Sequence, residues 1–247
     1  MFGSKGRRIE NLERELKQTK RESQELISNV SHELRTPLAA IEAIVDNVVE
    51  GVTDWDHGKG EQILEYINRQ DNIITYLLDL AKVESGELKL KYSNIDARNW
   101  VFGQVEPIEM LEPHKELTFI INVVPDDLKI SIDPARFGQV LTNLLTNAIR
   151  HATDQTEIEI SVFKNQRSNT GFCLLVFNEG EELFQSDHDI FERFKSSATQ
   201  RVGKTGGTGI GLSIAKWITE LHNGSIEVAD PSKYNYPAGT LFKVMVS

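Results

Sequence analysis

The sequence has few of the features that mark secreted, membrane-spanning or nucleic-acid-binding chains. It holds one cysteine, Cys173, so no intramolecular disulfide can form, and its apolar neighbours favour a buried small side chain. No run approaches the roughly 20 apolar residues that cross a bilayer, and no signal peptide is visible. The formal net charge of -10 argues against a broad basic surface, so we expect no nucleic-acid partner.

Positive charge is concentrated at the N-terminus. Residues 1–21 hold seven Lys and Arg against three Glu. This excess fits the solvated surface of a coiled coil or a segment close to an anionic membrane. We interpret residues 1–22 as an N-terminal signalling extension of coiled-coil type.

Two long helices are predicted before residue 86. Apolar residues recur at three- and four-residue steps from about residue 9 to 51 and again from 63 to 81, which is the spacing of one helical face. A turn rich in Gly and Asp, residues 51–60, separates the two runs. A single hairpin cannot bury both apolar stripes, so we expect a homodimer in which two copies form a four-helix bundle.

The first of these helices carries a histidine beside a carboxylate. In the run 27–38 (ISNVSHELRTPL), Glu33 follows His32, and Thr36 falls one turn later on the same face. A neutral imidazole is a competent nucleophile, and a nearby carboxylate can hold its tautomer and take its proton. Pro37 cannot donate to the carbonyl of Glu33, so the helix should bend or loosen there. A lone His-Glu pair is more often a surface pair, whereas the whole run favours a phosphate acceptor.

After residue 86 the pattern changes to alternating strands and helices. The predicted strands are 88–92, 117–124, 156–163, 173–177 and 240–246, and the predicted helices are 97–112, 134–152 and 211–223. This order indicates an α+β two-layer sandwich, one sheet backed by helices. We assign 23–88 to the helical hairpin and 89–247 to the sandwich.

The predicted helix 134–152 carries a row of uncharged amides. Gln139, Asn143, Asn147 and Arg150 stack along a face separate from the apolar one. Read alone, such a row is usually a solvated face. Amide oxygens also suit Mg²⁺, because they ligate a hard cation without neutralising it and leave positions for phosphate oxygens and water.

A glycine-rich segment, residues 206–212 (GGTGIGL), precedes the last predicted helix. Its glycines let the backbone approach an anion, and the helix N-terminus supplies free N–H donors. Two familiar nucleotide motifs are excluded here. Ala198 stands where a P-loop needs its first glycine, and Leu212 stands where a dinucleotide fingerprint needs its third.

Four segments in this order resemble the sensor histidine kinases of two-component systems. The run 27–38 resembles their H-box, 136–152 (RFGQVLTNLLTNAIRHA) the N-box, 190–194 (IFERF) the F-box and 206–216 (GGTGIGLSIAK) the second glycine box. The resemblance covers roughly residues 20–245. It implies the ATP-binding fold that these kinases share with gyrase-type and Hsp90-type ATPases.

The resemblance also implies a set of ATP and Mg²⁺ contacts. By it, Asn147 ligates Mg²⁺, Asn143 lies at the metal or the phosphates, Arg150 lies near the phosphates, and His151 stands where an aromatic residue often meets the adenine. The other implied ATP-site residues are Asn178, Gly180, Phe191, Phe194, Lys204, Gly207, Thr208, Gly209, Gly211 and Leu212. The two phenylalanines are expected to hold a lid over the nucleotide, formed by residues 195–206, rather than to touch ATP.

The first glycine box departs from the family pattern Asp-x-Gly-x-Gly. Residues 178–182 read NEGEE, so Asn178 replaces the acid that accepts a hydrogen bond from the adenine amino group, and Glu182 replaces the second glycine. An amide oxygen still accepts, but charge-assisted hydrogen bonds are roughly twice as strong. We therefore expect weakened ATP affinity without loss of binding.

The reaction implied by the resemblance is ATP-dependent autophosphorylation on His32. Glu33 would act as the general base, and the phosphoryl group would pass to an aspartate of a response regulator receiver domain. Thr36 stands where the family positions water to dephosphorylate the regulator. The resemblance further implies a cytoplasmic piece of a bacterial parent anchored at the cell membrane. Two alternatives stay open: a catalytically weak dimeric scaffold (pseudokinase), and a gyrase-type ATPase, which gives no reason for the His32 helix.

Overall fold

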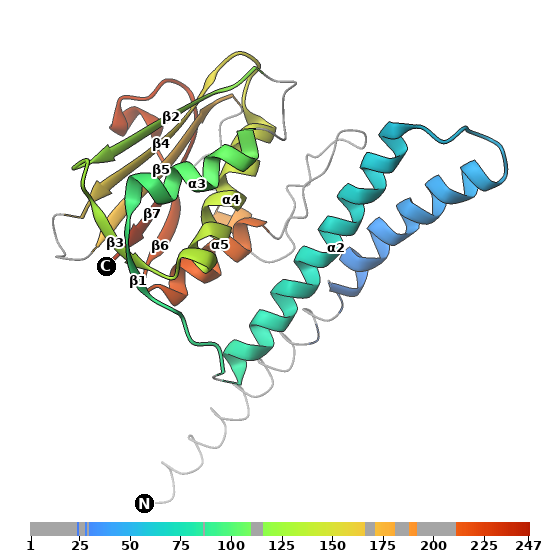
Figure 1. Ribbon diagram of the computed structural model, residues 1–247, viewed down its shortest axis with the longest axis horizontal. Coiled ribbons are helices and arrows are strands. Elements are labelled where there is room, and N and C mark those ends of the chain that lie inside the picture. The colour runs from blue at the N-terminus through green and yellow to red at the C-terminus, as the bar shows by residue number, and fades with distance from the viewer. Residues whose placement is uncertain are drawn as a thin grey trace, which may run out of the picture. The chain divides into compact units, whose positions relative to one another are not determined.

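The computed structural model describes residues 24, 28, 30–85, 87–109, 116–165, 171–180, 188–191 and 211–247. The chain divides into two compact units, Met1–Ser85 and Gly86–Ser247 (Figure 1). Within the described residues, no helix combines the length and the apolar character needed to cross a membrane.

The first unit is an antiparallel pair of helices, as predicted. One helix covers residues 30–49 and the other, α2, covers His57–Glu84. Gly51 follows the first helix with a φ of 70°, the left-handed conformation that commonly ends a helix. Asp56 precedes α2 and accepts a hydrogen bond from the backbone N–H of Lys59 at 2.8 Å, which satisfies a free donor at the helix start. The last residues of the predicted turn therefore belong to α2.

The second unit is built on a five-stranded sheet of order β2-β4-β5-β7-β6. The strands are β2 (Thr118–Val124), β4 (Glu157–Lys164), β5 (Phe172–Glu179), β6 (Ser225–Ala229) and β7 (Gly239–Val246). β2 runs parallel to β4, and the other neighbours are antiparallel. A separate antiparallel pair joins β1 (Ser93–Asp96) to β3 (Lys129–Ile132).

Three helices form the second layer of this unit. They are α3 (Ala97–Glu109), α4 (Pro134–His151) and α5 (Gly211–Leu221), and they pack on one face of the sheet (Figure 1). A large hydrophobic core joins helices and sheet, and its largest fully buried side chains include Phe137, Phe172 and Phe242. A smaller cluster of Leu175, Phe177, Ala229 and Leu241 is separate from it. Two short 3-10 helices, η1 (His188–Phe191) and η2 (Pro231–Tyr234), complete the described elements. The two-layer α+β prediction is confirmed.

The strand predicted at 88–92 is wrong, because this segment is irregular and β1 follows it. The backbone N–H of Lys91 donates to the carboxylate of Asp133 at 2.8 Å instead of to a neighbouring strand. The ring of Tyr92 meets that of His222 edge-on, with centroids 5.4 Å apart. The Leu-Lys alternation therefore marks an irregular segment held by these contacts. β3 and β6 were not predicted, since strands of 4 and 5 residues give too short a pattern.

Candidate functional site

Residues from three elements meet at the C-terminal half of α4. A Cβ on Gly211, the first residue of α5, would lie 3.1 Å from the Oδ1 of Asn143. Gly180, just after β5, has a φ of 145°, and a Cβ there would collide with the carbonyl oxygen of His151. Ala152 forms a β-bridge with Gly180. The structure thus brings the amide row of α4 beside the start of α5 and the end of β5, as the predicted ATP-site residues require.

Two amide oxygens in this region are buried without a hydrogen-bond partner. They are Oδ1 of Asn147 on α4 and Oδ1 of Asn178 on β5. The Asn178 side chain is fully buried, and its Nδ2 donates weakly to the carbonyl of Glu179 at 3.4 Å. A buried acceptor without a donor costs about 1–3 kcal/mol, so the site is suited to a ligand that completes these bonds.

The donor set fits a magnesium nucleotide. Amide oxygens and phosphate oxygens are hard ligands of the kind that Mg²⁺ prefers. Among the described residues, no cluster of three or more His, Cys, Asp or Glu side chains forms an alternative metal site. Asn147 therefore fits the metal-ligand position, and Asn178 fits an acceptor for a nucleobase N–H.

Thr240 is a member of this region that the sequence reasoning missed. It is buried on β7 and is the Cα partner of Asn178 across the β5-β7 ladder. The available signal was a hydroxyl at the start of the otherwise mainly apolar closing strand.

The remaining predicted ATP-site residues occupy different environments. Arg150 is exposed in the last turn of α4, and Leu212 is half-buried against the hydrophobic core. Phe191 is 7% exposed and packs edge-on against Phe242, with ring centroids 6.3 Å apart. This packing makes Phe191 part of the core, and the lid of residues 195–206 that it was expected to hold lies outside the described residues. The predicted residues that lie outside the described part of the chain are Phe194, Lys204, Gly207, Thr208 and Gly209.

A buried imidazole joins the two helices that carry the site. The backbone N–H of Asp133, the N-cap of α4, donates to Nε2 of His222 at 3.1 Å. Nδ1 of His222 lies 2.8 Å from the carbonyl oxygen of Ile218 in α5. Burial lowers the pKa of His222, against the opposing effects of that carbonyl and of Asp133. His222 thus ties the end of α5 to the start of α4.

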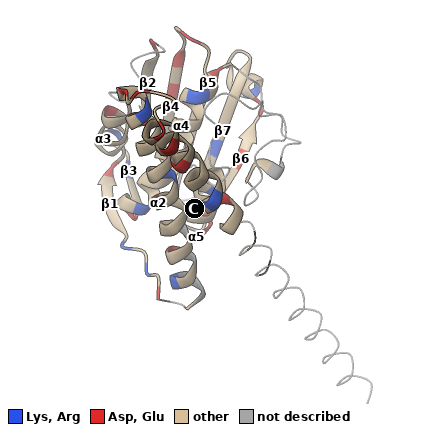
Figure 2. Ribbon diagram, turned by 90° about the vertical axis from the view of Figure 1, so that its right-hand side faces the viewer, with Lys and Arg blue, Asp and Glu red and all other residues tan. Residues whose placement is uncertain are grey.

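Burial also affects the pKa of two further groups in this unit, the Asp133 carboxyl and the Cys173 thiol. Burial raises the pKa of Asp133, but hydrogen bonds from the backbone of Lys91 and Arg136 outweigh it and leave the pKa below its usual value. Partial burial raises the pKa of the Cys173 thiol to about 11, and the side chain, predicted to be buried, is only half-buried. Figure 2 shows acidic and basic residues interspersed over the described elements of this unit.

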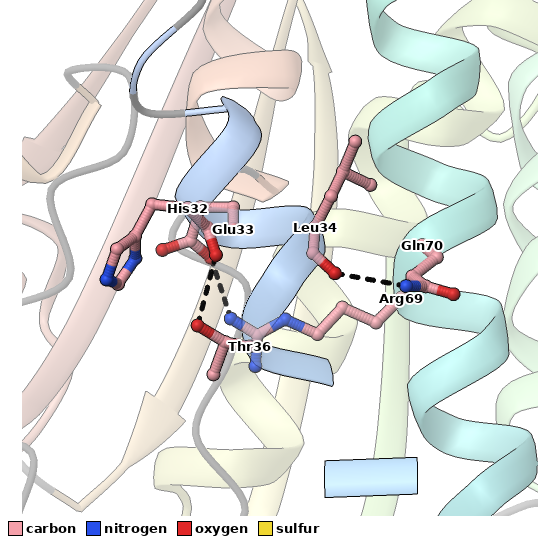
Figure 3. A network of polar contacts seen from close by, with 6 residues as sticks. All are labelled: His32, Glu33, Leu34, Thr36, Arg69 and Gln70. Carbon is pink, nitrogen blue, oxygen red and sulfur yellow. Dashed lines mark hydrogen bonds and ion pairs between the residues drawn. The ribbon is translucent and has the colours of Figure 1, made fainter. Parts of the chain in front are cut away.

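The helix 30–49 presents the predicted phosphoacceptor residues in the first unit. His32 is exposed, and the hydroxyl of Thr36 donates to its backbone carbonyl at 3.1 Å (Figure 3). The carboxylate of Glu33 accepts from Nη2 of Arg69 at 2.8 Å, and the Leu34 carbonyl accepts from Gln70 at 3.1 Å. Neither α2 residue was predicted, because helical periodicity does not specify which side chains meet across a hairpin.

Fold and site together define a helical hairpin with an exposed histidine, followed in the chain by an α/β unit with an amide-lined site. Residues 22–86 match the model of the His Kinase A (phospho-acceptor) domain. Residues 132–247 match that of the histidine kinase-, DNA gyrase B-, and HSP90-like ATPase. The chain belongs to the sensor histidine kinases.

Individual proteins agree with this assignment. The chain is 31% identical over 217 residues to the sensor protein kinase WalK of Staphylococcus haemolyticus, covering 86% of this chain and 35% of that protein. It therefore spans about a third of the length of that curated relative. Among solved structures, the Acinetobacter baumannii histidine kinase AdeS has a TM-score of 0.69 at 22% identity and covers 87% of this chain and 97% of its own. Histidine kinase ThkA, solved in complex with the response regulator protein TrrA, has a TM-score of 0.67 at 21% identity, over 96% of this chain and 65% of its own. The structural likenesses support the fold.

Proposed function

We propose that this chain transfers the γ-phosphate of ATP to His32 and then to an aspartate of a response regulator. The observation that carries the proposal is an exposed His32 in a phosphoacceptor hairpin, in one chain with an ATPase-type unit. Nucleophilic attack by an imidazole needs a nitrogen open to the donor, and exposure supplies it. The buried histidine of the second unit, His222, lacks that access because it is 2% exposed.

In this proposal the ATPase-type unit binds ATP, the phosphate donor. Asn147 would ligate Mg²⁺, which draws charge from the phosphates, and Asn143 lies one turn away toward the start of α5. Arg150 would approach the phosphates from the exposed end of α4, and His151 and Asn178 would contact the adenine. Phosphoryl transfer depends mainly on positioning and on stabilising the charge spread over the phosphate oxygens. We propose that these residues position ATP and stabilise that charge.

The hairpin would supply the acceptor and its proton transfer. Glu33 is the carboxylate nearest in sequence to His32, and we propose it as the general base for the imidazole. Thr36 lies one turn from His32, and its hydroxyl oxygen keeps a lone pair for a water molecule that would dephosphorylate the regulator. A receiver domain is the proposed partner, in line with the response regulator bound to ThkA.

We also propose that the hairpin forms a homodimer. Its described helices expose large apolar side chains, and on α2 four of them recur at i, i+3, i+10 and i+14, along one face: Leu64, Ile67, Ile74 and Leu78. An exposed apolar stripe of this kind is a typical contact surface, and a second copy of the same hairpin offers a matching one. Because the chain spans about a third of its curated relative, we propose that the whole protein adds a sensor and a membrane anchor, with this part in the cytoplasm.

The catalytically weak scaffold is the one rival with structural support. Asn178 is neutral and buried, so it offers the nucleobase an acceptor without charge. A scaffold would bind ATP weakly and form no phosphohistidine.

Incubation with Mg²⁺ and γ-labelled ATP tests the proposal. We expect acid-labile label on the unaltered chain and none on His32→Gln or Asn147→Asp, with circular dichroism unchanged for both. Asn94→Asp, the same change at an exposed position of β1, should label at the normal rate. Label retained on His32→Gln contradicts the acceptor assignment, and an unaffected Asn147→Asp contradicts the metal role.

A further inference from the structure

Arg69 and Gln70 of α2 contact Glu33 and Leu34 of the helix 30–49, which we call the phosphoacceptor helix. Nη2 of Arg69 donates to Oε2 of Glu33 at 2.8 Å, and both side chains are mostly buried, at 19% and 22% exposure. Next to this ion pair, Nε2 of Gln70 donates to the backbone carbonyl of Leu34 at 3.1 Å. Figure 3 shows both contacts between the same two stretches of helix.

The ion pair directs the Glu33 carboxylate away from the histidine beside it. Successive residues on an α-helix point about 100° apart, so His32 and Glu33 do not face each other. In Figure 3 the imidazole of His32 points away from the Arg69 guanidinium, while the carboxylate of Glu33 turns toward it. No hydrogen bond joins the side chains of these two described neighbours. A carboxylate oxygen must lie within about 2.6–3.2 Å of the nitrogen whose proton it removes, directly or through one water.

The second contact fixes the backbone at the same point. Pro37 has no N–H, so the helix lacks the bond that would tie residue 37 to the carbonyl of Glu33. The Gln70 amide adds a bond to the next carbonyl, that of Leu34, where the helix is weakened. Pro37 itself is buried. A local rotation that brought Glu33 toward His32 would therefore have to break the ion pair and strain this bond.

We propose that Arg69 is a positioning residue that holds the Glu33 carboxylate away from His32 and so limits autophosphorylation. The inference rests on the proposed function, because it needs Glu33 as the base for His32. Arg69 competes with the imidazole for one carboxylate, and the rate of phosphohistidine formation follows the fraction of chains in which Glu33 is released. Gln70 supports the held arrangement through the Leu34 carbonyl.

The test compares Arg69→Met with matched variants under saturating Mg²⁺-ATP. We expect the first-order rate of label incorporation to rise about three- to tenfold, since a mostly buried ion pair no longer opposes release of Glu33. The KM for ATP should stay unchanged, because ATP binds in the other unit. Arg69→Lys keeps the charge and should stay near the unaltered rate. Lys82→Gln removes an exposed cation from α2, the helix that carries Arg69, and should have no effect.

If Arg69→Met disturbs the hairpin, Gln70→Ala tests the same restraint on Glu33 independently. It leaves the ion pair's residues intact, and we expect a smaller rise in rate in the same direction. Circular dichroism and the molecular mass of each variant show whether the hairpin and its association persist. A purely structural role for Arg69 would leave the rate unchanged or lower it, so an increase in rate at constant KM separates the two roles.

The outcomes distinguish this inference from the proposed function. A faster Arg69→Met with a near-normal Arg69→Lys supports the inference. If the unaltered chain is labelled on His32 while Arg69→Met and Gln70→Ala are no faster, the inference is overturned and the proposed function stands. If the unaltered chain takes no label, both are overturned, because Arg69 then has no base to restrain.

Discussion

The two units of this chain treat their apolar side chains in opposite ways. The described hairpin buries Val30 and Ile73 but exposes nine large apolar residues: Leu38, Val45, Val49, Val52, Trp55, Leu64, Ile67, Ile74 and Leu78. The α/β unit buries an extended core and exposes few large apolar residues: Tyr92, Phe102, Val124 and Phe163. Burial of apolar surface is the main driving force of folding. The second unit therefore has an extensive core within one chain, whereas the hairpin leaves much of its apolar surface exposed, and we propose that a second copy covers it.

This contrast separates the proposed roles as well. The unit with its own core can hold a nucleotide site rigidly, since α4, α5 and β5 share one packed interior. The hairpin exposes an apolar face, which we propose for association, and leaves His32 exposed on the proposed phosphoacceptor helix. Variants that act on one unit and spare the other can break or sharpen the contrast.

The largest expected effect is loss of the dimer on Ile74→Glu. Ile74 is 46% exposed in the single chain, so the change should cost the monomer little, but it buries a charge in the proposed interface. We expect the dissociation constant to rise at least about tenfold. Analytical ultracentrifugation over a concentration series measures it.

Phe102→Glu is the matched control in the other unit. Phe102 is 51% exposed on α3, and the same apolar-to-acid change there should leave the association unchanged. If Phe102→Glu rather than Ile74→Glu dissociates the dimer, the interface lies on the α/β unit, which would overturn the comparison.

A smaller effect is expected for Asn178→Asp on ATP affinity. A carboxylate would make a charge-assisted hydrogen bond with the adenine amino group where the amide makes a neutral one, so ATP should bind about three- to tenfold more tightly. Isothermal titration calorimetry with Mg²⁺-ATP measures the change. Asn94→Asp and Ile74→Glu should both leave the ATP affinity unaltered. Weaker ATP binding by Asn178→Asp would show that Asn178 does not contact the nucleobase.

The smallest expected effect is the pH dependence that His222 gives to the α/β unit. Its pKa is lowered in the folded chain by burial, so below about pH 6.5 the unfolded chain takes up a proton more readily than the folded one. The contribution of neutral His222 to the free energy of unfolding is therefore fully present above that pH and is lost as the pH falls. The loss is limited because the Ile218 carbonyl and Asp133 act in the opposite direction.

Thermal unfolding between pH 7.5 and 5.5 measures this effect against a variant. Tm should fall by a few degrees in the unaltered chain and by less in His222→Gln, which has no titrating ring. The two chains are otherwise identical, so the comparison isolates the contribution of His222. An equal pH slope in the two chains would show that His222 does not titrate differently on folding.

Long amphipathic patterns allowed most of the fold to be predicted. The helix pair, the α+β layer, α4 and the strands around Cys173 follow from periodicity and from turn residues. The segment 88–92 misled the prediction, because alternation alone cannot show that Lys91 bonds to an N-cap carboxylate far along the chain. Short strands such as β3 gave too little pattern.

The site was predictable where its residues lie in ordered motifs. Asn143 and Asn147 lie on the predicted helix, and Asn178 directly follows the predicted strand 173–177 and belongs to β5. The structure places the amide oxygens of Asn147 and Asn178 in buried positions without partners. Arg69 could not be predicted, because its importance depends on the pairing of two helices, and local spacing does not encode which side chains meet. Thr240 depends in the same way on strand register.

Mapping the phosphorylated residue tests the central claim most directly. The unaltered chain would be incubated with Mg²⁺ and ATP, digested under alkaline conditions that preserve phosphohistidine, and analysed by mass spectrometry. The account predicts one modified residue, His32, and no modification when Asn147→Asp is treated in the same way. A phosphoryl group on another residue, or modification of His32 that persists in Asn147→Asp, would contradict it.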